Sequence, residues 1–149
     1  MKICDCMFEN INWKAVSAEI MGTFFLVFFG VSAIANNDIT IANNDGVVEY
    51  SFTGCVGLIT LTLTLFVLVH ILGPVSGSHL NPVITIPTFL SDKMDRDTTI
   101  AYIGGQIIGA CLGFYLFDLI NPGTTDSMLD GDLALFLAAL VGTTFFGAS

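Results

Sequence analysis

Charged side chains are scarce in this sequence. Of its 149 residues, only 11% are Asp, Glu, Lys or Arg, and only four of these are cations, whereas 54% are hydrophobic. A soluble domain of this size needs a polar surface to cover its core, and so few charges cannot supply one. Four cations also make no basic patch, so no nucleic-acid partner is expected. The composition therefore indicates a membrane protein.

Patterns that would carry catalysis or bind a cofactor are also missing. No nucleophile is paired with a base, and no glycine-rich cofactor loop occurs, so neither an enzyme nor a cofactor is expected. The cysteines form no zinc-type cluster, so no metal site is expected. Two lie in the N-terminal tail, as reduced thiols or lipid attachment sites, and two lie within apolar stretches. They are Cys4, Cys6, Cys55 and Cys111.

Long apolar stretches dominate what is present. Three of them are about 20 residues long, enough to cross a hydrocarbon core of about 30 Å as α-helices. A fourth stretch runs to Ser149 without a charge. The four stretches are 16–35, 52–72, 100–120 and 133–149. They predict three complete transmembrane helices and a fourth that is cut short. The acidic residues before the first stretch disfavour a cleaved signal peptide.

The positions of the cations predict the orientation. If the N-terminus is cytoplasmic, all four fall on the cytoplasmic side, as the positive-inside rule expects. The segments 36–50 and 121–132 are then extracellular and carry no cation. The cations are Lys2, Lys14, Lys93 and Arg96. The sequence therefore predicts an integral multi-pass membrane protein with a cytoplasmic N-terminus, in either a plasma or an internal membrane.

An irregular segment separates the second and third apolar stretches. Two glycines, Gly73 and Gly77, and Pro74 are expected to break the second helix there. Asn81 followed by Pro82 is typical of a new helix start, with Asn as the N-cap and Pro in the first turn. The predicted helix is short, because charges follow at 92–97. A chain that enters the membrane and returns in this way is tolerated only inside protein or beside an aqueous cavity. The segment therefore indicates a permeation path.

Two stretches carry a family resemblance. Residues 76–85 read SGSHLNPVIT, which resembles the first pore loop of the aquaporin and glycerol-facilitator (major intrinsic protein) family, usually Ser-Gly-x-His-x-Asn-Pro-Ala-Val-Thr. Residues 18–30 resemble the opening helix of that family, and Gln106 with Gly109 is a weaker match. Residues 138–146 also echo the start of the first helix, at an offset of about 120 residues, as expected of an internal repeat.

The resemblance implies an all-α membrane protein with an aquaporin-like, right-handed helical bundle. It would contain three complete transmembrane helices, one re-entrant half-helix and a truncated fourth helix. The expected divisions are a cytoplasmic tail (1–14), a first repeat (15–120, with a pore loop at 73–90), and an extracellular loop with the start of a second repeat (121–149). A second Asn-Pro box is expected beyond Ser149.

Site residues follow from the same resemblance. The side-chain amide of Asn81 is expected to donate hydrogen bonds to the permeant, or else to act only as an N-cap. Pro82 is expected to hold the loop, and so is Val83, which stands where the family usually has Ala. Glu19 is expected to accept hydrogen bonds from the loop backbone; the alternative is a carboxylate that reaches water. The expected pore-lining residues are Gly77, Ser78, His79, Leu80, Asn81 and, in the filter, Leu61.

The function implied is passive passage of water or small neutral solutes such as glycerol across a lipid bilayer. The channel would be part of a longer chain and would assemble as a homotetramer. An aliphatic Leu61 suggests an unusual filter and leaves water and glycerol both open. Because half a channel builds one wall of its pore, the 149-residue chain alone is expected not to conduct. The alternative is a truncated, non-conducting relative with a structural or regulatory role.

Overall fold

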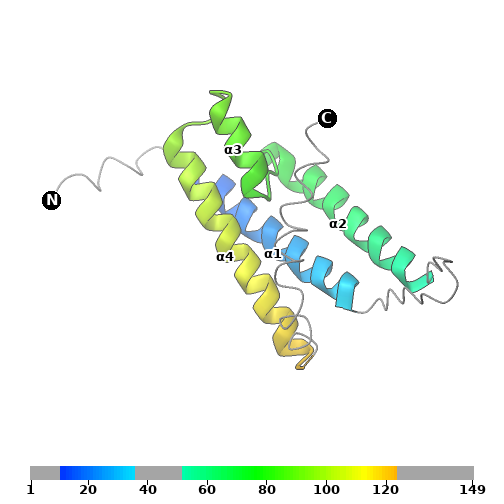
Figure 1. The fold of residues 1–149 in the computed structure, drawn as a ribbon. Helices are drawn as coiled ribbons and strands as arrows, with labels where there is room; N and C mark the ends of the chain where they lie inside the picture. The colour runs from blue at the N-terminus through cyan, green and yellow to red at the C-terminus, as the bar shows by residue number, and fades with distance from the viewer. Residues whose placement is uncertain (1–10, 36–51, 124–149) are drawn as a thin grey trace, which may run out of the picture.

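The computed structural model describes residues 11–35 and 52–123, and all their regular structure is helical (Figure 1). The helices are α1 (Trp13–Ala35), α2 (Phe52–Ser76), α3 (Pro82–Leu90) and α4 (Arg96–Ile120). Three of them, α1, α2 and α4, are long and apolar enough to cross a membrane. The prediction of an all-α membrane protein with three spanning helices is confirmed. The predicted fourth helix lies outside the described residues.

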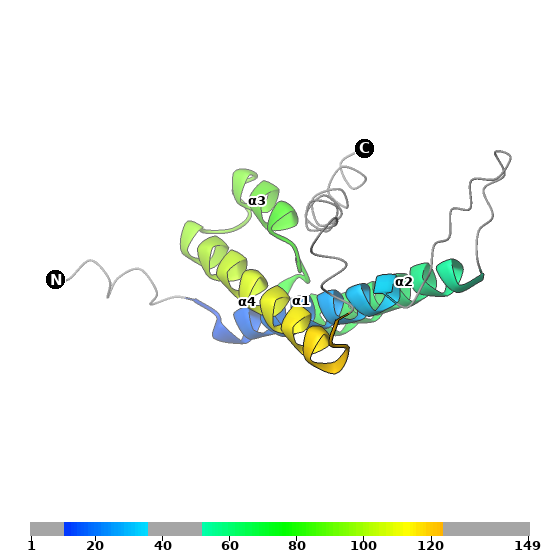
Figure 2. The same ribbon diagram turned by 60° about the horizontal axis from the view of Figure 1, so that its bottom comes forward.

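Helix α1 is the central element of the bundle. It packs against both α2 and α4, while the short α3 packs against α4 (Figures 1 and 2). Helix α3 sits at the end of the bundle where α1 and α4 begin and α2 ends (Figure 1). The cations Lys14, Lys93 and Arg96 belong to this same end. Most of α2 is exposed and apolar, as expected of a surface that lipid or further protein covers.

Helices α1 and α4 approach each other at glycines. A Cβ atom on Gly109 would overlap the backbone carbonyl of Ile20, and one on Gly113 would lie 2.5 Å from the carbonyl oxygen of Phe24. Only glycine allows backbones to pack this closely, a common device in membrane helices. The close approach brings the polar side chains of α1 and α4 within reach of each other.

The end of α2 lies at one of the three residues predicted to break it. Gly73 and Pro74 lie within the last turn, and the helix continues to Ser76, beyond the apolar stretch that ends at Leu72. Pro74 lies in the last turn, where its fixed φ is compatible with the helix and its missing N–H removes a single hydrogen bond. The helix stops at Gly77, which has a φ of 84° and donates its N–H to the carbonyl of Gly73 at 2.9 Å. A left-handed glycine is a common helix terminator.

The start of α3 is as predicted. Asn81 has an extended backbone and caps the helix, because its Oδ1 accepts a hydrogen bond from the backbone N–H of Val83 at 3.0 Å. Pro82 occupies the first turn, where a missing N–H has no consequence. The prediction of a short helix that starts at this pair is confirmed.

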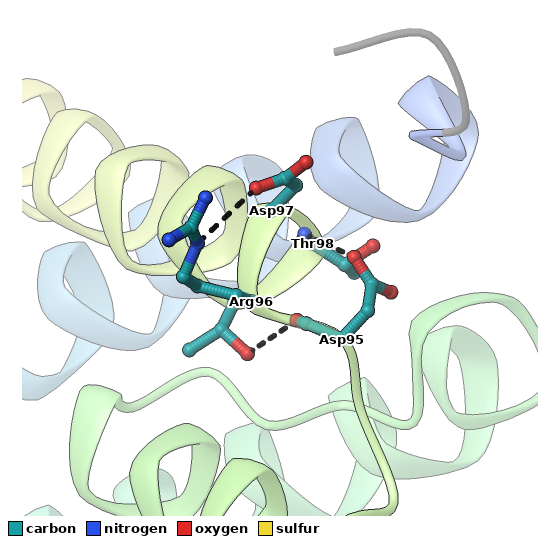
Figure 3. A network of polar contacts seen from close by, with 5 residues as sticks. Asp95, Arg96, Asp97 and Thr98 are labelled. Carbon is teal, nitrogen blue, oxygen red and sulfur yellow. Dashed lines mark hydrogen bonds and ion pairs between the residues drawn. The ribbon is translucent and has the colours of Figure 1, made fainter. Parts of the chain in front are cut away.

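Helix α4 begins earlier than its apolar stretch. Asp95 is the N-cap and accepts a hydrogen bond from the N–H of Thr98 at 2.9 Å (Figure 3). Arg96 and Asp97 form an ion pair at 3.6 Å that is too exposed to contribute much stability. Because the sequence prediction used apolar residues alone, it did not include this polar first turn in the helix.

Candidate functional site

The five residues that connect α2 to α3 have an unusual backbone. Gly77, Ser78 and Leu80 all have positive φ, at 84°, 48° and 51°. A side chain in the left-handed region costs about 1 kcal/mol, and such conformations persist only where surrounding contacts hold them. The contacts that hold this loop therefore define the site.

The carboxylate of Glu19 in α1 is the main contact. It is completely buried, with 0% of its surface exposed. Its Oε1 accepts hydrogen bonds from the hydroxyl of Ser76 at 2.6 Å and the backbone N–H of His79 at 3.0 Å. Its Oε2 accepts from the backbone N–H of Leu80 at 2.6 Å and from Nε2 of Gln106 at 2.8 Å. Four donors compensate a buried carboxylate that would otherwise be very unfavourable.

A second polar layer joins α4 to α3. Nε2 of Gln106 also donates to Oγ1 of Thr85, at 3.0 Å. The Thr85 side chain is fully buried, and its hydroxyl donates to the carbonyl of Asn81 at 3.2 Å. Nδ1 of His79 lies 3.2 Å from the same hydroxyl oxygen. These hydrogen bonds connect the buried side chains of Glu19, Gln106 and Thr85 to the half-buried ring of His79.

Two further hydroxyls fix the ends of the loop. Tyr102 in α4 donates to the carbonyl of Ser76 at 2.9 Å, where α2 ends. Thr23 in α1 donates to the carbonyl of Leu80 at 3.4 Å. Because Thr23 is near the middle of α1, the tip of the loop lies beside the middle of that spanning helix.

The predicted pore-lining residues of the loop differ in exposure. The side chains of Ser78 and Leu80 are buried; that of Ser78 donates to the carbonyl of Leu68 at 3.3 Å. Leu80 packs so closely on Gly22 that a Cβ there would overlap its side chain. Gly77 is exposed, and Asn81 is half-buried. These two residues give the loop an accessible polar edge.

Leu61 lies apart from the other predicted site residues. It is half-buried in α2, and a Cβ on Gly30 of α1 would lie 3.3 Å from its Cδ1. Gly30 is about two helical turns beyond Thr23, about 10 Å farther along α1 at 1.5 Å per residue. The structure therefore places Leu61 deeper than the loop tip, toward the opposite end of the bundle.

Four residues of the site had no role predicted from the sequence. Two of them, Thr23 and Tyr102, are polar side chains within an apolar stretch, and the other two lie in the irregular segment between the second and third stretches. A polar residue within a membrane span is the signal that could have identified the first two. The four residues are Thr23, Ser76, Thr85 and Tyr102, while Gln106 was noticed only as a family match.

Comparison with known proteins identifies the family. The family model described as Major intrinsic protein matches residues 7–145. The lens fiber major intrinsic protein of Lithobates pipiens is 35% identical over 123 residues, which cover 83% of this chain and 41% of the relative. Aquaporin NIP1-2 of Arabidopsis thaliana is 37% identical over 127 residues, covering 85% and 40%.

A microbial relative gives a similar result. The probable aquaporin AqpM of Archaeoglobus fulgidus is 35% identical over 115 residues, covering 70% of this chain and 46% of the relative. The chain thus spans less than half the length of each of these relatives. The match nevertheless includes α1, the loop between α2 and α3, and α4, and the chain belongs to the major intrinsic protein family.

Proposed function

We propose that this chain forms one wall of a channel for water and small neutral solutes. Residues 15–120 are its first repeat, and 73–90 are its pore loop. One observation carries the proposal: Asn81 begins α3 on a loop whose tip lies beside the middle of α1. The positive end of a helix dipole is thereby placed near the centre of the membrane.

The mechanism follows from the groups at this helix start. The N-terminus of α3 carries about half a positive charge, which repels cations and protons. Because Oδ1 of Asn81 accepts from Val83, the orientation of its amide is set, and its NH2 group is the proposed donor to a passing water or hydroxyl oxygen. The loop carbonyls supply acceptors. Passage then needs no covalent chemistry and selects neutral molecules that form hydrogen bonds.

The opposite wall of the pore is proposed to lie outside the described residues. Within those residues, Gly77 is exposed and Asn81 is half-buried. Residues 121–149 would begin the second repeat, and further polypeptide would complete the pore. The assembled protein is proposed to be a homotetramer, which native mass spectrometry of the detergent-extracted protein would test.

The proposed orientation places the N-terminus in the cytoplasm. Lys14, Lys93 and Arg96 lie at one end of the bundle, and the positive-inside rule assigns that end to the cytoplasm. Labelling of a cysteine introduced at Lys93 by a membrane-impermeant reagent, in sealed right-side-out and inverted vesicles, tests this. Labelling of the right-side-out vesicles alone would reverse the orientation.

Permeation through reconstituted protein tests the function. The protein, at the length it has in its native membrane, is reconstituted in liposomes. Stopped-flow light scattering then measures the permeability of the liposomes to water and to glycerol. Asn81→Asp keeps the oxygen that caps α3 but removes the NH2 donors and adds a negative charge. We expect at least a tenfold loss of flux. The control is Thr62→Val, because the Thr62 hydroxyl is exposed and, among the described residues, bonds only within its own helix, to the carbonyl of Leu58.

Two outcomes would contradict the proposal. If the wild-type protein is no faster than empty liposomes for either solute, the non-conducting alternative is favoured. If Asn81→Asp leaves both fluxes unchanged, Asn81 is only a helix cap, and the pore does not pass this loop. A loss with Asn81→Asp but not with Thr62→Val supports the channel.

A further inference from the structure

We propose that the buried chain Glu19–Gln106–Thr85 positions His79 by fixing its tautomer. In this arrangement Nδ1 of His79 carries the proton, and Nε2 is a hydrogen-bond acceptor at the accessible edge of the loop. The tautomer follows from the contacts of the described residues alone. Its consequence for selectivity rests on the proposed channel function.

The first step is the orientation of the Gln106 amide. Its nitrogen lies 2.8 Å from Oε2 of Glu19 and 3.0 Å from Oγ1 of Thr85. Turning the amide over would press its oxygen against the carboxylate. The observed orientation leaves Oε1 of Gln106 buried without a hydrogen-bond partner. That unfavourable feature is retained because the carboxylate requires a donor at this point.

The second step assigns the hydrogen bonds of the Thr85 hydroxyl, which can donate one proton and accept at two lone pairs. Gln106 Nε2 can only donate, so it uses one lone pair. The carbonyl of Asn81 can only accept, so it takes the proton, at 3.2 Å. The remaining lone pair meets Nδ1 of His79 at 3.2 Å. All three contacts are hydrogen bonds only if Nδ1 of His79 is protonated.

A competing arrangement is chemically possible. The hydroxyl of Thr85 could turn its proton toward Nδ1 of His79, which would place the histidine proton on Nε2. The carbonyl of Asn81 would lose the hydroxyl but keep the N–H groups of Ile84 and Thr85, at 3.1 and 3.2 Å. This alternative forms one hydrogen bond fewer. The two arrangements differ in which ring nitrogen is protonated, so an experiment can distinguish them.

The position of the ring gives the tautomer a consequence. The imidazole of His79 meets the ring of Tyr102 edge-on, with centroids 5.5 Å apart. Its Cδ2 and Nε2 lie 3.4 Å from where a Cβ on Gly77 would be, and Gly77 is exposed. An unprotonated Nε2 therefore gives the edge an acceptor for O–H groups, next to the amide donors proposed for Asn81. Water and polyols carry both kinds of group.

Nitrogen NMR of the full chain tests the proposal directly. The chain has two histidines, so a His70→Gln background leaves His79 as the only one. With 15N-histidine labelling in lipid at pH 8, the expected spectrum has a protonated Nδ1 and an unprotonated Nε2. Thr85→Val should shift the population at least severalfold toward the Nε2–H form, which free imidazoles prefer. Thr85→Ser should restore the wild-type spectrum.

Thr88→Val is the matched control. Thr88 lies one turn later in α3 and also donates its hydroxyl to the carbonyl four residues back, that of Ile84, at 2.8 Å. Among the described residues, no hydrogen bond joins its hydroxyl to His79, so its removal should leave the spectrum unchanged. A wild-type spectrum with Nε2 protonated overturns the proposal, and this holds even if Thr85→Val fails to fold. An unchanged spectrum in a folded Thr85→Val also overturns it.

The same samples separate this inference from the channel function. An Nδ1–H tautomer that depends on Thr85, in a protein without flux, would uphold the inference and reject the channel. Flux together with an Nε2–H tautomer would do the reverse. If both hold, Thr85→Val should reduce glycerol flux severalfold and Thr85→Ser should recover it.

Discussion

Oε2 of Glu19 lies 2.6 Å from the backbone nitrogen of Leu80, although the two residues are 61 positions apart in the chain. Leu80 has a φ of 51°, a conformation that leucine avoids without external support. The contact provides that support from α1, outside the loop. The carbonyl of Leu68 in α2 and the hydroxyl of Tyr102 in α4 also hold the loop, so three helices together determine its shape.

Replacing Glu19 by Gln should destabilise the protein. An NH2 group would face donors that now meet a carboxylate oxygen, so at least one hydrogen bond is lost and a donor is left buried. We expect the free energy of unfolding to fall by about 3 kcal/mol. Denaturant titration in detergent measures this. Asp97→Asn, which loses only an exposed ion pair, should change it by less than about 1 kcal/mol. Equal losses in both variants would contradict the role of Glu19.

Adding a methyl group to Gly109 should separate α1 from α4. Because the new Cβ would overlap the carbonyl of Ile20, Gly109→Ala is expected to cost about 1–3 kcal/mol. The matched control is Gly104→Ala in the same helix, where a Cβ meets nothing within 4 Å. That change should be neutral or slightly stabilising. Thermal unfolding of the two variants in one detergent gives the comparison, and similar melting temperatures would show that the close approach is unimportant.

Removing the hydroxyl of Tyr102 should loosen the end of α2. Tyr102→Phe keeps the ring but leaves the carbonyl of Ser76 without its donor, at an expected cost of about 1–2 kcal/mol. Hydrogen exchange at the amides of 77–81 should also rise. Tyr115→Phe, which alters an exposed tyrosine of the same helix, serves as the reference and should change neither quantity. The prediction fails if exchange rises equally in both.

Acid should weaken the start of α4. The hydrogen bond from the backbone N–H of Thr98 lowers the pKa of Asp95 below its ordinary value of 3.8. A lowered pKa gives stability that is complete above the unfolded pKa and is lost as pH falls through the folded one. Asp95→Asn keeps a capping oxygen but does not titrate. The difference in stability between wild type and Asp95→Asn should be constant from about pH 7 to 5 and change by about 0.5 kcal/mol below about pH 4. A difference independent of pH would contradict it.

Local sequence patterns predicted the parts of the fold that depend on neighbouring residues. The Asn81–Pro82 pair predicted the start of α3 correctly, because a cap and a first-turn proline act within one helical turn. The same kind of reasoning predicted three breakers after the second apolar stretch but not which of them acts. Gly73 and Pro74 lie in the last turn of α2, and the positive φ of Gly77 ends the helix. The hydrogen bonds that hold the loop after α2 decide which of several helix breakers ends the helix.

Contacts across the bundle could not be predicted from local patterns. Thr85 reads as an ordinary helix residue, and Gln106 as an isolated polar one, until folding brings them within 3.0 Å of each other. Their pairing depends on the approach of α4 to α1 at Gly109 and Gly113, which only the three-dimensional structure defines. The family resemblance pointed to the loop, but it contained no information on the chain that leads to His79.

The anchors of the loop are spread along the order in which the chain is made. A ribosome completes Glu19 first, the loop next, and Tyr102 and Gln106 of α4 last. Until α4 enters the membrane, the loop region lacks the hydrogen bonds from Tyr102 and Gln106. Its polar backbone groups then need water or the insertion machinery as partners. Closure of the loop therefore has to wait for α4, the last of the described helices to be made. An interruption between α3 and α4 would leave a polar loop that lipid cannot accept.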